Sequence, residues 1–82
     1  MMKTLRLPQM ARGQRGTIES VSEQNGFSKR LADMGFVRGA EITMIKPGRP
    51  CIVSVAGRQI GLGSRGQQHV QVRTLVGAVD PA

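Results

Sequence analysis

The chain has 82 residues and a mass of 8.8 kDa, which allows one small domain with a thin core. That size excludes most self-contained metabolic enzymes, because they need a deep pocket and a scaffold around it. Twelve Lys and Arg against five Asp and Glu leave a net charge of +7, and 11 Gly and four Pro predict many turns. We therefore expect a small, basic, soluble binding domain.

The cysteine count and the apolar stretches restrict the compartment. A single cysteine, Cys51, excludes an intramolecular disulfide and a Cys-rich zinc site. Residues 1–11 contain Lys3 and Arg6 with no apolar run after them, so no export signal is expected. The longest apolar stretches fall far short of the roughly 20 residues that a membrane-spanning helix needs. These features predict a cytoplasmic protein.

The charges are unevenly distributed. Residues 1–18 hold basic side chains and no acid, and the same is true of residues 42–79. The basic residues of the second segment are Lys46, Arg49, Arg58, Arg65 and Arg73. A fold that gathers them would present a positive face suited to an acidic protein, a nucleic acid or anionic lipid. A solvated surface that only keeps a small protein in solution is the other interpretation.

The first half of the chain predicts one strand and one short helix. Residues 14–21 alternate polar and apolar side chains after a Gly-rich start, which is typical of a strand. A polar connection follows over residues 22–26. Ser28 is then expected to cap a helix that ends near residue 34, with Gly35 just beyond its last turn. Leu31 and Met34 share one face of this helix, which must dock on a sheet because it is too short to stand alone.

The second half changes to a period of two. Strands are predicted over residues 41–45, 51–55 and 58–62, with a two-residue turn at 56–57 between the last two. Residues 63–67 are expected to form a turn or a single helical turn. A half-buried strand follows from residue 70, and residues 76–82 are expected to fray as a tail.

These elements predict a mainly β fold. Short strands of this kind cannot build two separate layers, so a small, strongly bent sheet that closes on itself is the economical arrangement, because closure removes exposed edges. We expect an SH3-like β-barrel of about five strands with one short inserted helix at about 28–34. The expected domain spans residues 1–75, with residues 76–82 as a flexible tail.

The segment that joins the helix to the next strand reads Arg30-Leu31-x-x-Met34-Gly35-Phe36-x-x-Gly39. It resembles the signature of the ferrous iron transport protein A (FeoA) family, and flanking patterns extend the resemblance over about residues 5–75. The chain departs from the family at Gly63 and Gln67, where a polar or basic residue and a small apolar residue are usual. The short helix found there in relatives is therefore expected to be weak or absent.

The resemblance implies a cytoplasmic accessory protein of bacterial ferrous iron uptake. Such proteins are thought to act on FeoB, a membrane transporter with a cytoplasmic GTPase domain, so FeoB is the expected partner. The module is also similar to the C-terminal SH3-like domain of iron-dependent repressors. We expect a regulator rather than an enzyme, with no cofactor and no direct membrane insertion. A weak homo-oligomer is left open.

The same motif supplies the candidate partner-binding residues. They are Arg30, Leu31, Met34, Gly35, Phe36 and Gly39. A groove beside this corner could receive the partner, and Arg30 could act on the phosphates of a GTPase. The other interpretation is a helix-to-strand corner whose apolar side chains anchor it in the core, with Arg30 on the surface or paired with Asp33 or Glu41.

Metal and nucleic-acid binding are the remaining alternatives. Cys51, His69, Asp33 and Asp80 do not have the spacing of a ligand cluster, so no intrinsic metal site is expected, although weak or intermolecular binding through His69 or Cys51 is left open. The charge of +7 favours phosphate binding. The two phenylalanines are both expected in the core, which leaves no aromatic platform for bases, and no nucleic acid is expected as partner.

Overall fold

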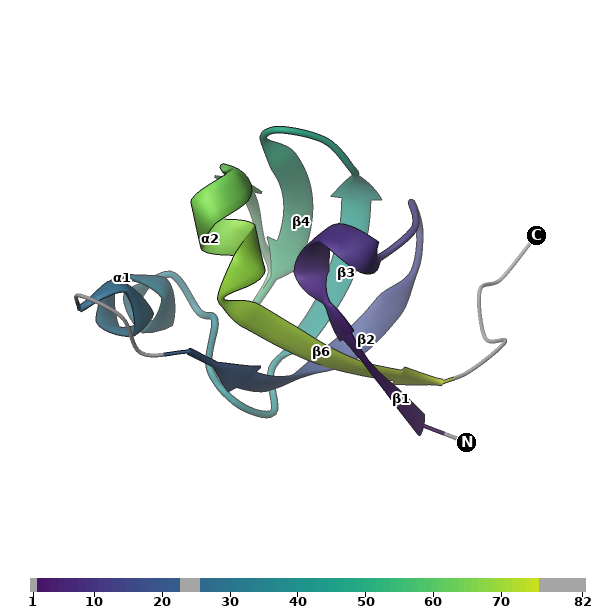
Figure 1. Ribbon diagram of the computed structural model, residues 1–82, viewed down its shortest axis with the longest axis horizontal. Coiled ribbons are helices and arrows are strands. Elements are labelled where there is room, and N and C mark those ends of the chain that lie inside the picture. The colour runs from purple at the N-terminus through teal and green to yellow at the C-terminus, as the bar shows by residue number, and fades with distance from the viewer. Residues whose placement is uncertain (1, 23–25, 76–82) are drawn as a thin grey trace.

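The computed structural model describes residues 2–22 and 26–75, which form one antiparallel sheet with three short helical segments packed around it (Figure 1). The strands are β1 (Met2–Arg6), β2 (Arg15–Val21), β3 (Glu41–Lys46), β4 (Cys51–Val55), β5 (Arg58–Leu62) and β6 (Val70–Leu75). The helical segments are η1 (Leu7–Gln9), α1 (Phe27–Asp33) and α2 (Ser64–Gln68). The mainly β fold with a short inserted helix is confirmed, and the strands number six rather than about five.

The strand order shows how the sheet is assembled. It runs β1-β6-β2-β3-β4-β5, so the last strand lies between the first two, while β2 to β5 follow one another along the chain. The register shifts between Ile18 and Ser20 where β2 pairs with β6, and between Met44 and Lys46 where β3 pairs with β4. Such irregularities increase local twist and bend the strands. They let one sheet curve around a single core, but its end strands β1 and β5 do not pair with each other, so within the described residues the sheet does not close on itself as predicted.

Alternate residues of the strands point into that core. In β4, Cys51, Val53 and Val55 are buried, whereas the residues between them are half-exposed. The buried apolar side chains are Leu7, Met10, Ile18, Leu31, Phe36, Ile42, Met44, Cys51, Val53, Val55, Leu62, Val70 and Val72. They come from every strand of the sheet except β1, and from both η1 and α1. The two helical segments are therefore part of the folding unit.

Strand β1 is present in the structure but is not among the strands that the sequence predicted. Lys3, Thr4 and Arg6 are exposed, and Leu5 is only partly buried against the core. The strand pairs with β6 along its length, from Met2 opposite Leu75 onward. Because backbone pairing with a strand far along the chain holds β1 in the sheet, its side chains need not alternate between apolar and polar. The sequence of β1 is therefore only weakly typical of a strand.

Helix α1 begins earlier than expected. It starts at Phe27, and its N-cap is Gly26, which has a φ of +73° and provides no side-chain cap. Ser28 lies inside the helix, so the prediction that it caps the helix is wrong. Residues 23–25 of the expected polar connection lie outside the described part of the chain.

The second half matches the predicted pattern closely, with one correction. Ala56 and Gly57, at φ +52° and +77°, form the two-residue turn between β4 and β5. The expectation of a weak or absent helix after β5 is wrong, because α2 forms over five residues. The expected tail, residues 76–82, lies outside the described residues.

Candidate functional site

The corner after α1 is built on a Schellman motif. The backbone N–H of Gly35 donates to the carbonyl of Ala32 at 2.9 Å, and that of Phe36 donates to the carbonyl of Leu31 at 2.9 Å. Gly35 has a φ of +103°, a conformation that glycine reaches without the steric cost of a Cβ. The motif places Phe36 against Leu31, which is the apolar contact that commonly accompanies this kind of helix end.

The six predicted partner-binding residues divide by exposure. Leu31 and Phe36 are 0% and 1% exposed, and Met34 is partly buried against the same core. Gly35 is partly buried as well, whereas Arg30 and Gly39 are exposed. In this conformation Leu31 and Phe36 anchor the corner and present no surface to a partner.

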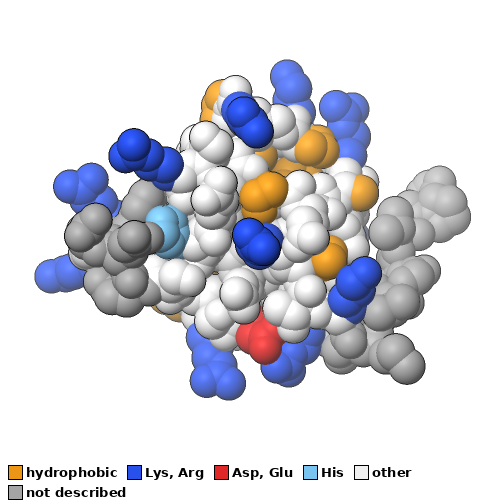
Figure 2. All heavy atoms as spheres, viewed as in Figure 1, with side chains coloured by type: hydrophobic (Ala, Val, Ile, Leu, Met, Phe, Trp, Pro, Cys, Tyr) orange, Lys and Arg blue, Asp and Glu red, His pale blue; other side chains and the backbone are white. Residues whose placement is uncertain are grey.

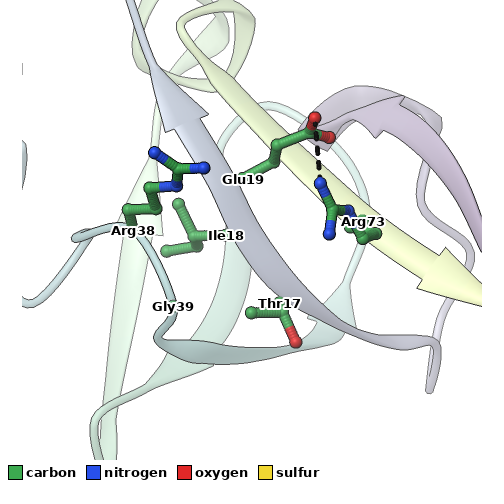
Figure 3. Close-up of a pocket in the computed structure, with 6 residues that line it drawn as sticks. All are labelled: Thr17, Ile18, Glu19, Arg38, Gly39 and Arg73. Carbon is green, nitrogen blue, oxygen red and sulfur yellow. Dashed lines mark hydrogen bonds and ion pairs between the residues drawn. The ribbon is translucent and has the colours of Figure 1, made fainter.

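Beyond the corner, the chain is attached to β2 by backbone hydrogen bonds. The N–H of Gly39 donates to the carbonyl of Ile18 at 2.9 Å, and the N–H of Ile18 donates to the carbonyl of Ala40 at 2.8 Å. Gly39 has a φ of +92°. Beside this attachment lies an open hollow of about 240 Å³ (Figure 3). Its lining residues are Thr17, Ile18, Glu19, Arg38, Gly39 and Arg73.

The charged groups of the hollow are organised around Glu19. The Thr4 hydroxyl donates to Glu19 Oε1 at 2.6 Å, and Arg73 Nη2 lies 3.4 Å from Glu19 Oε2. The Thr4 hydrogen bond, followed by the interaction with Arg73, holds the pKa of the Glu19 carboxyl below its usual value. Figure 3 shows Arg38 across β2 from Arg73, with the strand between the two guanidinium groups. Glu19 therefore pairs with Arg73 and also attracts Arg38, whose side chain stays exposed.

The hollow was not predicted as a site, although Gly39 belongs to it. Arg38 is the residue from which the sequence could have predicted the hollow. It lies within the corner motif and is a charged side chain between two glycines, Gly35 and Gly39, that have positive φ. Glu19 and Arg73 carry no such signal, because 54 positions separate them in sequence. Only the pairing of β2 with β6 brings them together.

The candidate metal ligands do not gather among the described residues. No group of three or more His, Cys, Asp or Glu side chains lies together in residues 2–22 and 26–75. Cys51 is fully buried within β4, and burial raises the pKa of its thiol above the usual value. His69 is partly buried at the end of α2, and Asp80 lies outside the described residues.

The helices in the described part of the chain are also too short or too polar to cross a membrane. Among the residues whose burial the structure describes, the exposed large hydrophobic side chains are Val37 and Ile45, at 47% and 38% exposure. Figure 2 shows hydrophobic side chains grouped on one face and Lys and Arg side chains projecting around them, with little acidic surface. The visible face is thus suited to an acidic macromolecular partner.

Several solved structures have this fold. An iron uptake regulatory protein, FeoA, is 27% identical with a TM-score of 0.83, and the match covers 89% of this chain and 100% of that one. FeoA of Stenotrophomonas maltophilia, solved with zinc and described as an SH3 domain protein, is 27% identical with a TM-score of 0.74, over 83% and 88% of the two chains. The chain therefore has the SH3-like architecture that its strand pattern predicted.

A manganese-dependent transcriptional repressor shares the fold alone, at 18% identity and a TM-score of 0.82, with 92% of this chain matched to 44% of the repressor. A search of curated proteins found no match. The family model described as the FeoA domain matches residues 5–74, which include all six strands at least in part and the whole corner motif. The chain belongs to the FeoA family, which is linked to ferrous iron transport.

Proposed function

We propose that this protein is a cytoplasmic regulatory accessory protein of bacterial ferrous iron uptake, which binds the GTPase-bearing part of the transporter FeoB. The observation that carries the proposal is the FeoA domain match over residues 5–74. The net charge of +7 supports an acidic protein partner. The protein acts by binding rather than by catalysis, and it reaches the inner face of the membrane through its partner.

The contact surface lies at the corner after α1 and uses its exposed side chains. Arg30, Val37 and Arg38 are all exposed there, and Val37 is 47% exposed between a buried phenylalanine and an arginine. An apolar side chain flanked by cations is typical of the centre of a protein interface with a charged rim. Leu31 and Phe36 contribute by holding the corner in place. Residues 1–75 form the binding domain, with residues 76–82 as a tail outside it.

Nucleic-acid binding is the second candidate, and the net charge of +7 is the observation that favours it. Phe36 is 1% exposed, so it is not available to stack on a base. A gel mobility shift with single-stranded DNA tests this candidate. If the shift disappears at physiological salt, the binding is nonspecific attraction to the phosphates.

The test is a titration of the ¹⁵N-labelled protein with the cytoplasmic GTPase-bearing domain of FeoB from the same organism, at low and at physiological salt. We expect amide shifts around residues 30–39 that persist at physiological salt. Val37→Asp should weaken binding about tenfold or more, because it places an unpaired carboxylate in the apolar centre of the contact. Arg12→Ala, which removes an exposed cation from the turn before β2, is the control and should change the affinity only at low salt.

Two outcomes would count against the proposal. Absence of any shift at either salt concentration would contradict binding to this domain. Shifts that vanish between the two salt concentrations, with equal effects of the two variants, would leave only nonspecific attraction between opposite charges.

A further inference from the structure

Strand β5 lies at one end of the sheet, so one side of its backbone pairs with β4 and the other side pairs with no strand of the described residues. Its register identifies which groups face outward. Arg58 is opposite Val55 across the two-residue turn, and in a hairpin of this kind that closing pair exchanges both backbone hydrogen bonds. The alternation of an antiparallel ladder then directs the N–H and C=O groups of Gln59 and Gly61 away from β4.

The outward positions are accessible. Gln59 and Gly61 are exposed, and Ile60 between them is only partly buried. Gly61 has no side chain to shield its backbone, and nothing would lie closer than 3.8 Å to a Cβ at that position. At the far end of β5 the Gln67 side chain donates to the carbonyl of Leu62 at 3.0 Å. Since the backbone groups of Leu62 face β4 by the same alternation, the open stretch of the edge consists of the outward groups of Gln59 and Gly61.

The charged side chains that residues 42–75 contribute around this edge are all basic. Arg58 begins β5, and Arg65 lies in α2 directly after its end. Gln67 of α2 also donates to the carbonyl of Gly48 at 2.9 Å, which attaches to the same helix the loop that follows Lys46 and carries Arg49. No Asp or Glu occurs in residues 42–75. An acidic segment is attracted to this edge, whereas a second copy of the chain would bring the same cations against it.

The edge also adjoins the proposed contact surface. A Cβ at Gly35 would lie 3.2 Å from both Ala56 Cβ and Val55 Cγ1, so the corner after α1 packs directly on the hairpin turn from which β5 starts. One partner can therefore engage the corner and the edge together. Natural proteins usually protect an exposed edge with a bulge, a proline or a covering loop, and residues 58–61 contain no proline.

We infer that the open edge of β5, with the outward backbone groups of Gln59 and Gly61, receives an extended acidic segment of the protein partner as an added strand. Backbone hydrogen bonds provide the pairing, and the surrounding cations select an acidic segment. This inference rests on the proposed function and names the part of the surface and the kind of segment that it uses.

Amide hydrogen exchange of the labelled wild-type protein, with and without the FeoB cytoplasmic domain, tests the inference. We expect exchange at Gln59 and Gly61 to slow by about tenfold or more when the domain is bound, because their N–H groups become donors to the added strand. Ile60, whose N–H already faces β4, serves as the internal reference and should change little.

A matched pair of variants gives a second readout. Gly61→Pro removes the outward N–H without touching the pairing to β4, and should weaken binding about tenfold. Gly61→Ala keeps that N–H, and its Cβ meets only ordinary contacts, so its affinity should stay within about twofold of wild type. The amide spectrum of each variant checks that the fold is retained. If Gly61→Pro fails to fold, the wild-type exchange experiment decides.

The outcomes separate the two proposals. Binding with no protection at Gln59 and Gly61 would overturn the strand addition and leave the proposed function standing. No binding by the wild-type protein at either salt concentration would overturn both. Protection that appears with protein concentration alone, before the FeoB domain is added, would identify a second copy as the occupant and overturn the acidic segment.

Discussion

The two α-helices are attached to the sheet by different physical means. Helix α1 is held by Leu31 and Phe36, which are 0% and 1% exposed and belong to the main hydrophobic core. Helix α2 has a buried glutamine, Gln67, at 3% exposure. Its side-chain amide donates to the carbonyls of Gly48 and Leu62 and so connects the helix to a loop and to the end of β5.

The comparison shows why a departure from a family pattern need not remove an element. Where a small apolar residue is usual, the buried Gln67 donates its amide to two carbonyls, so its own polar group is satisfied inside the fold. The helix is therefore held by hydrogen bonds in place of apolar contact. At α1, by contrast, burial of large side chains dominates, and no polar substitute is available.

The largest effect is expected from removing the anchor of α1. Phe36→Ala should destabilise the fold by about 3–5 kcal/mol, because it deletes a fully buried ring and leaves a cavity. For a domain of this length that is a large part of the total stability, so much of the protein should be unfolded at 37 °C. Denaturant unfolding followed by circular dichroism measures the loss.

The neighbouring residue is the control for this substitution. Val37→Ala removes a side chain that is 47% exposed, and it should cost less than about 0.5 kcal/mol. Equal losses for the two variants would mean that the corner is not anchored by burial of Phe36.

A smaller effect is expected at α2. Gln67→Ala removes both hydrogen bonds that connect α2 to the Gly48 loop and to the end of β5, which should cost about 1–3 kcal/mol. Gln68→Ala in the same helix changes an exposed side chain and should leave the unfolding midpoint nearly unchanged. If both variants unfold at the wild-type denaturant concentration, the amide does not hold this helix in place.

The corner glycines allow the backbone cost to be separated from the packing cost. Gly35→Ala and Gly39→Ala both place a Cβ at a positive φ, and each should cost about 1–2 kcal/mol for that reason. A Cβ at Gly35 would also lie 3.2 Å from Ala56 and Val55, whereas nothing lies within 4 Å at Gly39. Gly35→Ala should therefore be the more destabilising of the two by thermal unfolding, and the opposite order would contradict the packing of the corner on the hairpin.

The smallest effect is electrostatic. The pKa of Glu19 is lowered chiefly by the Thr4 hydrogen bond, so the ionised carboxylate stabilises the fold. This contribution is complete above the carboxyl's ordinary pKa of 4.5 and is lost as the pH falls through the lower, folded-state value. Thr4→Val should raise the Glu19 pKa, as measured by NMR titration, because it deletes the largest single cause of the lowering. A Glu19 pKa that keeps its wild-type value in Thr4→Val would contradict this assignment.

Much of the fold was determined locally by the sequence. The turn at Ala56-Gly57, the strands on either side of it and the positive φ of Gly35 follow from residue types at fixed spacing, because turn chemistry and a period of two need only neighbouring residues. The motif around Phe36 predicted both a helix end and the family. The sequence predicted the residues of this motif as a single partner-binding site. In the structure Leu31 and Phe36 are buried in the core, whereas Arg30 is exposed.

Tertiary structure decided the rest, because those features depend on partners distant in the chain. Strand β1 exists through its pairing with β6, and the Glu19–Arg73 ion pair exists because β6 also pairs with β2. Gln67 is compatible with burial only because the carbonyls of Gly48 and Leu62 converge on its amide. Local sequence sets the conformation of each segment, but the polar contacts that a buried or exposed side chain makes depend on how the sheet brings distant segments together.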